Sequence, residues 1–294
     1  MTTFTPLLPH KAQLGECPRY DERTQILYWV DITAPAIHAY NTLDNTHTVY
    51  ATHEHVGCFA LHEQGGFIAG MRSGIWYLDA QAKPIKKLAD NPTDNSITRF
   101  NDGRADAKGR FWLGTVDEDK SQSVAAFYCF DGKQLTQFKS GLLTSNGVAF
   151  SPDNQYLYHS DTPRFTIYRH AFNLEEGTID EGETFLSMPR EIYGTGRPDG
   201  AAVDSEGYYW SALFEGNAII RVSPAGEIVA TYPIDVKCPT MCAFGGENLD
   251  ILYVTSASIG RSQEELLQFP DSGKLFSMKV PVKGCLDYRC TFKL

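Results

Sequence analysis

The chain lacks any run of apolar residues long enough to cross a membrane, which takes about 20 in succession. Its first residues, Met1-Thr-Thr-Phe-Thr-Pro, also lack the basic stretch and following apolar stretch of a secretory signal. We therefore expect a protein that neither spans a membrane nor carries an export signal. A cytoplasmic location follows as the default expectation.

A surplus of positive charge is also missing. The chain has 26 Lys and Arg against 36 Asp and Glu, for a formal net charge of −10. Nucleic acids and anionic membrane surfaces are bound through clustered Lys and Arg, so neither is an expected partner. The charge balance favours a metal cation instead and indicates nothing about protein partners.

Cysteine and histidine pairs at zinc-finger spacing are absent as well. The seven cysteines are an odd number spread over the whole chain, which favours reduced thiols over a disulfide framework. Cys238 and Cys242 are four residues apart, but no second pair follows them. A structural zinc site is therefore not expected.

What the sequence does contain is a repeat of a polar residue, two or three apolar residues, a turn and an aromatic strand. Its six copies begin 40 to 53 residues apart, at Glu16, Val56, Asn101, Asn146, Asp199 and Thr240. A period of about 40 to 50 residues with several short strands per copy is typical of a β-propeller. A long two-sheet sandwich is the alternative, but it would not repeat one unit six times.

The repeat predicts an all-β fold, with residues 1–294 forming one six-bladed β-propeller whose four-stranded antiparallel blades surround a channel. A closed ring of blades leaves no open edge strand if the two chain ends share a blade. We expect residues 2–14 and residues 285–294 to pair in this way.

The first residues of the six copies should form a ring around one mouth of the channel, because each blade's innermost strand lines it. Glu16, Asn101, Asn146 and Asp199 carry carboxylate or amide oxygens. Such a donor set suits one divalent metal ion, with calcium as the first expectation and zinc, manganese, magnesium or iron(II) also compatible. Asn and Asp can instead cap turns, but Glu16 is a poor turn residue, and converging carboxylates repel unless a cation or protons compensate.

Two arginines lie two residues upstream of ring positions, on the same strand face. Arg99 precedes Asn101 and offers fixed donors for the carbonyl and hydroxyl groups of a small polar ligand. Arg197 precedes Asp199 in the same way but is followed by Pro198 and is the weaker candidate. A surface arginine paired with a nearby acid is the alternative interpretation of Arg99.

Four segments in order resemble the family of gluconolactonases, senescence marker protein (regucalcin) and luciferin-regenerating enzyme, which includes bacterial sugar lactonases. They are Leu14-Gly-Glu-Cys-Pro, Arg99-Phe-Asn-Asp-Gly-Arg-Ala-Asp, Ser145-Asn-Gly-Val-Ala-Phe-Ser-Pro-Asp and Arg197-Pro-Asp-Gly-Ala-Ala-Val-Asp. The resemblance covers nearly the whole chain. It implies a six-bladed propeller.

The resemblance also implies residue roles. Glu16, Asn146 and Asp199 would be the ligands of the metal ion, while Arg99 and Asn101 would bind the substrate. Asp119 occupies the position of a Glu that in the family also reaches the substrate, and Cys17 stands where many relatives have Gly. These two departures leave the ring size and hydroxyl pattern of the substrate open.

The expected function is metal-dependent hydrolysis of a sugar-derived lactone to the sugar acid, with the lactone as a small-molecule partner and Asp199 as general base. The metal would act as a Lewis acid on the lactone carbonyl. Two alternatives remain open: hydrolysis of another ester or an organophosphate on the same fold, and a non-catalytic metal-binding scaffold.

Overall fold

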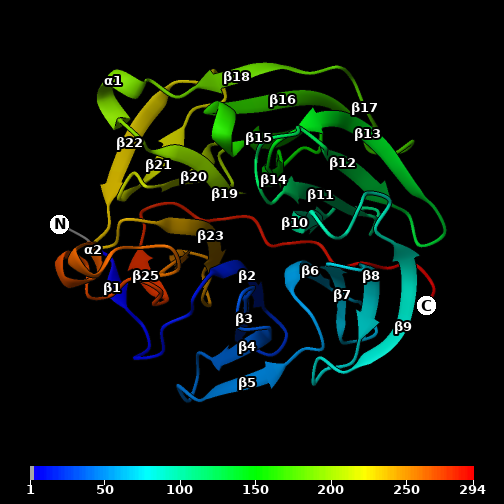
Figure 1. The fold of residues 1–294 in the computed structure, drawn as a ribbon, viewed down its shortest axis with the longest axis horizontal. Helices are drawn as coiled ribbons and strands as arrows, with labels where there is room; N and C mark the ends of the chain where they lie inside the picture. Colours follow the sequence, from blue (N-terminus) through cyan, green and yellow to red (C-terminus); the bar gives the residue numbers. More distant parts are fainter. Residues whose placement is uncertain (1–2) are drawn as a thin grey trace.

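The structure is a computed structural model that describes residues 3–294. Six antiparallel sheets are arranged radially around a central channel (Figure 1), which confirms the predicted six-bladed β-propeller. Five sheets have four strands, and the fourth blade has five. The strands in blade order are β2 (Gly15–Asp21), β3 (Ile26–Asp31), β4 (Ala36–Asn41), β5 (His47–Ala51); β6 (Val56–Leu61), β7 (Phe67–Met71), β8 (Gly74–Leu78), β9 (Pro84–Asp90); β10 (Thr98–Ala105), β11 (Phe111–Asp117), β12 (Ala125–Phe130), β13 (Leu135–Leu142); β14 (Ser145–Phe150), β15 (Tyr156–Asp161), β16 (Thr166–Asn173), β17 (Thr178–Ile179), β18 (Glu183–Ser187); β19 (Arg197–Val203), β20 (Tyr209–Phe214), β21 (Ala218–Val222), β22 (Ile228–Pro233); and β23 (Pro239–Gly245), β24 (Ile251–Ser256), β25 (Phe276–Lys279) with β1 (Thr5–Pro6).

The spacing of the repeat is explained by a side-chain hydrogen bond inside each of its two clearest copies. The indole Nε1 of Trp112 donates to Asp106 Oδ2 at 2.8 Å, and Trp210 Nε1 donates to Asp204 Oδ2 at 2.9 Å. Both carboxylates are fully buried, and each also accepts backbone N–H groups of its own turn. The Asp therefore fixes the turn after the innermost strand, and the Trp fills the space between blades.

The ring of blades is closed by the N-terminal strand, but with a different partner from the expected one. β1 pairs with β25 in the last blade, with Thr5 opposite Ser277. The expectation that residues 2–14 pair with residues 285–294 was wrong, because the final strand of the last blade is already complete at Lys279. Thr2 itself lies outside the described residues.

The C-terminal segment, residues 284–294, instead runs across the end of the channel (Figure 1). It contacts all six blades through hydrogen bonds or ion pairs. The contacts are Arg289 with Asp21, Cys290 with Leu61, Thr291 with Gly109, Tyr288 with Asn154, Cys285 with Val203 and Gly284 with Leu249. The segment therefore ties the blades together at one end.

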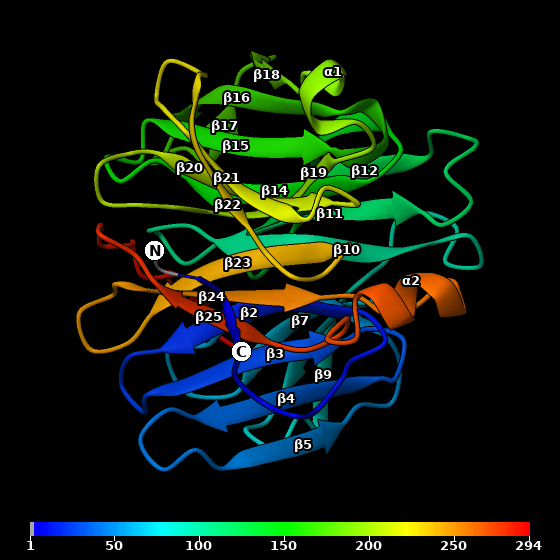
Figure 2. The same ribbon diagram turned by 90° about the vertical axis from the view of Figure 1, so that its left-hand side faces the viewer.

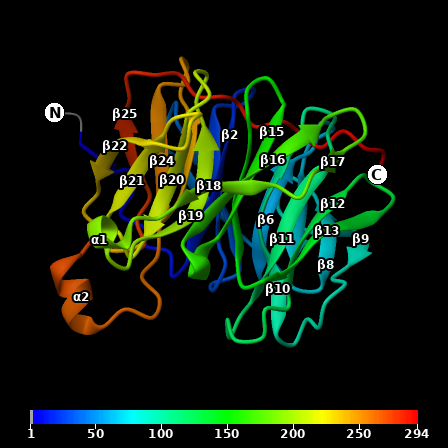
Figure 3. The ribbon, with the colours of Figure 1, turned by 90° about the horizontal axis from the view of Figure 1, so that it is seen from above.

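The other end of the channel carries the two short helices, α1 (Arg190–Tyr193) and α2 (Gln263–Gln268). Figures 2 and 3 show both helices at the end opposite to the C-terminal segment. Within residues 3–294, neither of these helices, nor any other, is long and apolar enough to cross a membrane. All seven cysteines are free, as expected, and six of them are buried.

Candidate active site

The six ring positions coincide with an irregularity in every innermost strand. Each of β2, β6, β10, β14, β19 and β23 shifts its register against the next strand at or immediately beside the predicted ring residue. A β-bulge of this kind re-aims a side chain and frees backbone from the ladder. The ring residues are therefore placed by a feature that recurs once per blade, at the end of the channel near α1 and α2.

Bulges require unusual backbone conformations. The residues that directly follow two of the ring residues in the sequence have such conformations. Gly147, which follows Asn146, has φ 63°, and an added Cβ would lie 2.3 Å from Tyr209 Oη. Cys17, which follows Glu16, has φ 51° in the left-handed region that glycine adopts most easily. Its Sγ accepts the Phe59 N–H at 3.2 Å, so the thiol packs into the neighbouring blade.

A chain of hydrogen bonds joins three ring residues and Arg99. Arg99 Nη1 donates to Asn101 Oδ1 at 2.7 Å, and Asn101 Nδ2 donates to Asn146 Oδ1 at 2.6 Å. Asn146 Nδ2 in turn donates to Asp199 Oδ1 at 2.6 Å. Residues from three blades thus meet at one point, although they are about 45 to 53 positions apart in the sequence.

Glu16 and Asp199 are the two carboxyl groups of the ring. Burial and the charge of Asp199, followed by that of Asp102, raise the pKa of Glu16 well above its usual value. Burial and Asp102 likewise raise the pKa of Asp199, while Arg197 and Lys120 oppose this shift. Two carboxylates held near one another in a largely dry site repel, and either a proton or a cation relieves the repulsion.

The donor set can be tested against a metal ion. Residues 3–294 contain no group of three or more His, Cys, Asp or Glu side chains placed to hold one, so a metal here would need the amide oxygen of Asn146 beside Glu16 and Asp199. In the structure Asn146 turns its Nδ2 towards Asp199 and its Oδ1 towards Asn101. Half a turn about the last side-chain bond brings Oδ1 beside Asp199, and a metal–oxygen contact would then replace the hydrogen bonds of Asn146 with Asn101 and Asp199. The resulting all-oxygen set with two carboxylates fits a hard or borderline divalent cation.

The structure places Asp119 and its neighbour Glu118 differently. Asp119 is exposed, whereas Glu118 Oε1 lies 3.6 Å from Arg99 Nε and accepts a hydrogen bond from Arg72 Nη2 at 2.7 Å. The side chain of Arg99 is largely buried and its partners hold it in place. Of these two neighbouring acids, the one that contacts Arg99 is therefore Glu118.

Three more residues of the site were not singled out from the sequence. Asp102 is 4% exposed and accepts the Val148 N–H at 3.0 Å, so its charge lies under the ring. Thr162 Oγ1 accepts a hydrogen bond from Asn146 Nδ2 at 2.9 Å. Arg72 reaches Glu118 from the second blade. Asp102 could have been found, since it directly follows a ring residue. Thr162 begins a short 3-10 helix (Thr162–Arg164) and Arg72 lies in a bend, and both are outside the repeat's signature.

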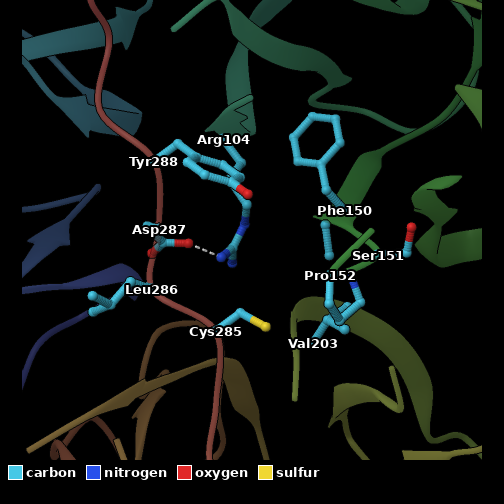
Figure 4. A pocket seen from close by; sticks show the side chains of 10 residues that line it. Arg104, Phe150, Ser151, Pro152, Val203, Cys285, Leu286, Asp287 and Tyr288 are labelled. Carbon is cyan, nitrogen blue, oxygen red and sulfur yellow. Dashed lines mark hydrogen bonds and ion pairs between the residues drawn. The ribbon is translucent and has the colours of Figure 1, made fainter. Parts of the chain in front are cut away.

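The opposite end of the channel has a cavity between the C-terminal segment and the fourth and fifth blades (Figure 4). Arg104 and Asp287 form an ion pair in its wall, beside Cys285 and Tyr288. Its volume is about 60 Å³, and none of the six ring residues lines it. The candidate active site is therefore assigned to the ring on the convergence of Glu16, Asn146 and Asp199, not on a cavity.

Known proteins resemble this chain in sequence and in fold. Residues 14–258 match the model of the SMP-30/gluconolactonase/LRE-like region. A 6-deoxy-6-sulfogluconolactonase from Pseudomonas putida is 43% identical over 97% of both chains, and a pentonolactonase from Haloferax volcanii is 30% identical over 99% of both. The crystal structure of a calcium-binding regucalcin from Agrobacterium tumefaciens has a TM-score of 0.92 at 24% identity, covering 98% of this chain and 97% of that one, which shows the shared fold.

Proposed function

The chain belongs to the SMP-30/gluconolactonase/LRE-like family and is a lactonase, and we propose that it hydrolyses an aldonolactone to the sugar acid with a divalent metal ion held by Glu16, Asn146 and Asp199. The observation that carries the proposal is the convergence of two carboxyl groups and one amide at the same bulge of three blades. The names of the two enzyme relatives indicate a sugar lactone as the substrate class.

Calcium is the first candidate for the metal, because the donors are all oxygen atoms and a structural relative is described as calcium-binding. Zinc, manganese, magnesium and iron(II) are compatible with the same donors. A divalent ion in this position would supply Lewis acidity to the lactone carbonyl.

Asp199 is the proposed general base. With one of its carboxylate oxygens on the metal ion, the other would be free to take the proton of the attacking water. Burial, followed by the charge of Asp102, raises the pKa of Asp199, which strengthens its carboxylate as a proton acceptor.

Arg99 and Asn101 are the proposed substrate-binding residues. The guanidinium of Arg99 is held by Asn101 Oδ1, by the Phe100 carbonyl and by Glu118, so its orientation is set before the lactone binds. A fixed donor of this kind binds a carbonyl or hydroxyl oxygen at little cost in side-chain entropy. Asp119 remains a candidate from the resemblance, but its exposed position favours Glu118 for the same role.

The proposal is tested with purified protein, stripped by a chelator and then supplied with one metal at a time. Acid release is measured from glucono-, galactono- and pentonolactones and from a phosphotriester. We expect lactone hydrolysis that stops on chelation and returns with a divalent ion. Phosphotriester hydrolysis alone would contradict the substrate class, chelator-resistant lactone hydrolysis would contradict the metal, and inactivity of the metal-supplied protein on every compound would favour a binding scaffold.

A further inference from the structure

The residue that follows each ring residue in the sequence contacts the next blade. Three of these residues are glycines whose backbones lie so close to that blade that an added Cβ would approach it to 3.0 Å or less: Gly57, Gly147 and Gly200. Two others reach it through sulfur, with Cys17 Sγ 3.2 Å from Phe59 N and Met241 Sδ 4.0 Å from Arg19 Nη1. The sixth is Asp102, the only charged member of the set.

Asp102 makes its contact through two hydrogen bonds that join two bulges. Its Oδ1 accepts the N–H of Gly103 at 2.7 Å, and its Oδ2 accepts the N–H of Val148 at 3.0 Å. Gly103 ends the bulge of β10 that carries Asn101, and Val148 lies in the bulge of β14 that begins at Asn146. One carboxylate thus connects the third blade with the fourth at the level of the ring.

The third blade bonds both backbone groups of Val148. The N–H of Val148 goes to Asp102, and its carbonyl oxygen accepts Arg104 Nε at 2.8 Å. Val148 is fully buried and, as part of the bulge, stands outside the register of β14 with β15. A buried N–H that loses its acceptor costs free energy, so this segment should move if Asp102 can no longer accept. The third blade therefore sets the position of Asn146, two residues earlier.

The two bulges carry side chains that contact one another. Asn101 Nδ2 donates to Asn146 Oδ1 at 2.6 Å and to the Ser145 carbonyl at 3.1 Å. Asn101 is a proposed substrate-binding residue and Asn146 a proposed metal ligand. Small displacements of such groups are costly, because a misplacement of about 1 Å can lower a rate about a hundredfold.

Asp102 acts through these neighbours and not on the substrate. Its side chain is only 4% exposed, and each of its oxygens accepts a backbone N–H. Arg19 helps to hold it, since Arg19 Nη2 lies 3.9 Å from Asp102 Oδ1 and donates to the Gly103 carbonyl at 2.7 Å.

We propose that Asp102 is a positioning residue, which sets the distance between Asn101 and Asn146 and thereby the distance between the bound lactone and the metal ion. The assignment rests on the proposed function, from which it takes the roles of the two asparagines. Groups that hydrogen-bond around a metal site typically change metal affinity or activity about ten- to hundredfold when they are substituted.

The substitution Asp102→Asn tests the proposal. It keeps the size of the side chain, but its NH2 group would face one of the two N–H donors and cannot accept from it. We expect the Kd for Ca²⁺ or Mn²⁺, titrated calorimetrically into the chelator-stripped protein, to rise about tenfold or more. KM for the aldonolactone that the wild type hydrolyses best should rise about three- to tenfold.

Asp106→Asn is the matched control for a loss of stability. Asp106 is fully buried at the other end of the same innermost strand and also accepts backbone N–H groups, those of Lys108 and Arg110, but within its own turn. This variant should unfold more easily while its metal Kd and its KM stay within about twofold of the wild type. Asp102→Asn leaves Arg19 with Asp287 at 3.5 Å, so it creates no cation without a counter-charge.

Two results would overturn the positioning role. If Asp102→Asn lowers only the free energy of unfolding, as the control does, the residue serves the fold alone. If it weakens metal binding but leaves KM unchanged, Asp102 acts through its charge and not through the spacing of the two asparagines.

Crystal structures of the metal-free wild type and of metal-free Asp102→Asn keep this proposal apart from the proposed function. The distance from Asn101 Nδ2 to Asn146 Oδ1 should lengthen from 2.6 Å to more than about 3.5 Å in the variant. If the wild type hydrolyses no lactone but this distance lengthens, the proposed function fails and the positioning of the two amides stands. An unchanged distance overturns the positioning role whatever the activity.

Discussion

Asp287, near the C-terminus, forms an ion pair with Arg104 in the third blade, 183 positions earlier in the sequence. Arg104 also donates from Nε to the Val148 carbonyl at 2.8 Å and from Nη2 to the Ala201 carbonyl at 2.7 Å, so one guanidinium joins three blades. Asp287 lies 3.5 Å from Arg19 as well. A single carboxylate in the C-terminal segment thus compensates two buried cations at the end of the channel.

The substitution Asp287→Asn should therefore destabilise the whole propeller. It leaves Asp102, 3.9 Å from Arg19, as the remaining counter-charge for two largely buried guanidinium groups, and we expect a loss of about 2 to 4 kcal/mol in the free energy of unfolding. Urea denaturation near neutral pH measures this. Asp90→Asn is the control, since Asp90 forms its ion pair with Lys87 while 85% exposed, and should cost less than about 0.5 kcal/mol. Equal midpoints for the two variants would show that the C-terminal ion pair contributes nothing.

Asp199→Asn tests the general base. The amide keeps the shape of the side chain and one oxygen, but it cannot take up a proton as the carboxylate does, so kcat should fall by about a hundredfold or more at saturating metal. Metal content is measured on the same sample, because a lost metal would also abolish activity. Wild-type turnover with the metal bound would rule out Asp199 as the base.

Glu118→Gln and Asp119→Asn decide which acid supports Arg99. Glu118 contacts both Arg99 and Arg72, so its substitution should lower kcat/KM by about tenfold through looser positioning of the guanidinium. Asp119→Asn changes an exposed group and should stay within about twofold of the wild type. If Asp119→Asn lowers kcat/KM more than Glu118→Gln does, Asp119 is the acid that supports Arg99. Thermal unfolding of both variants checks that the comparison concerns activity and not folding.

Gly147→Ala tests the bulge beside Asn146. Both a positive φ and close neighbours oppose a side chain here, since the new Cβ would lie 2.3 Å from Tyr209 Oη and 3.0 Å from the Asp199 carbonyl. Gly141→Ala is the matched control, because Gly141 has a similar φ of 72° with nothing within 4 Å of the added atom. The difference in unfolding free energy, about 1 to 3 kcal/mol, isolates the packing clash. Identical stabilities would mean that the bulge opens without cost.

His38 makes stability depend on pH. Burial, followed by the neighbouring His10 and His47, lowers its pKa to about 3, and Asp31 opposes the shift only weakly. Below about pH 6.5 the unfolded chain binds a proton at His38 that the folded protein does not, so stability falls as the pH drops from about 6.5 towards about 3. Between about pH 7.5 and about pH 5 this group should account for about 1 to 2 kcal/mol.

His38→Phe should flatten the fall in stability between these two pH values, measured by urea midpoints. His53→Gln, at an exposed histidine, is the control for the loss of a histidine as such. If His38→Phe shows the same fall as the wild type, the acid sensitivity comes from other groups.

The number of blades and the positions of Glu16, Asn101, Asn146 and Asp199 at one channel mouth could be read from the sequence alone. Both predictions follow from the repeat, because equivalent residues of its copies occupy equivalent places in the blades. Asn146 and Asp199 could therefore be placed side by side, although they are 53 positions apart, without knowing the structure of the loops between them. The buried pairs of Asp106 with Trp112 and Asp204 with Trp210 show why the repeat kept its spacing, since each copy must place the same turn and the same ring.

Only the tertiary structure decided what lies outside the repeat. The C-terminal segment carries no strand pattern, and its place is set by the ion pairs of Asp287 with Arg19 and Arg104, by backbone hydrogen bonds to the blades and by the packing of Cys290 and Phe292. Glu118 and Asp119 are adjacent in the sequence, and the sequence does not show which of the two side chains points towards Arg99. The structure shows that it is Glu118. The contact of Arg197 with Arg261 through Glu215 joins two blades through residues in turns and loops, where neither period nor hydrophobic pattern constrains the chain, and only the packed blades bring them together.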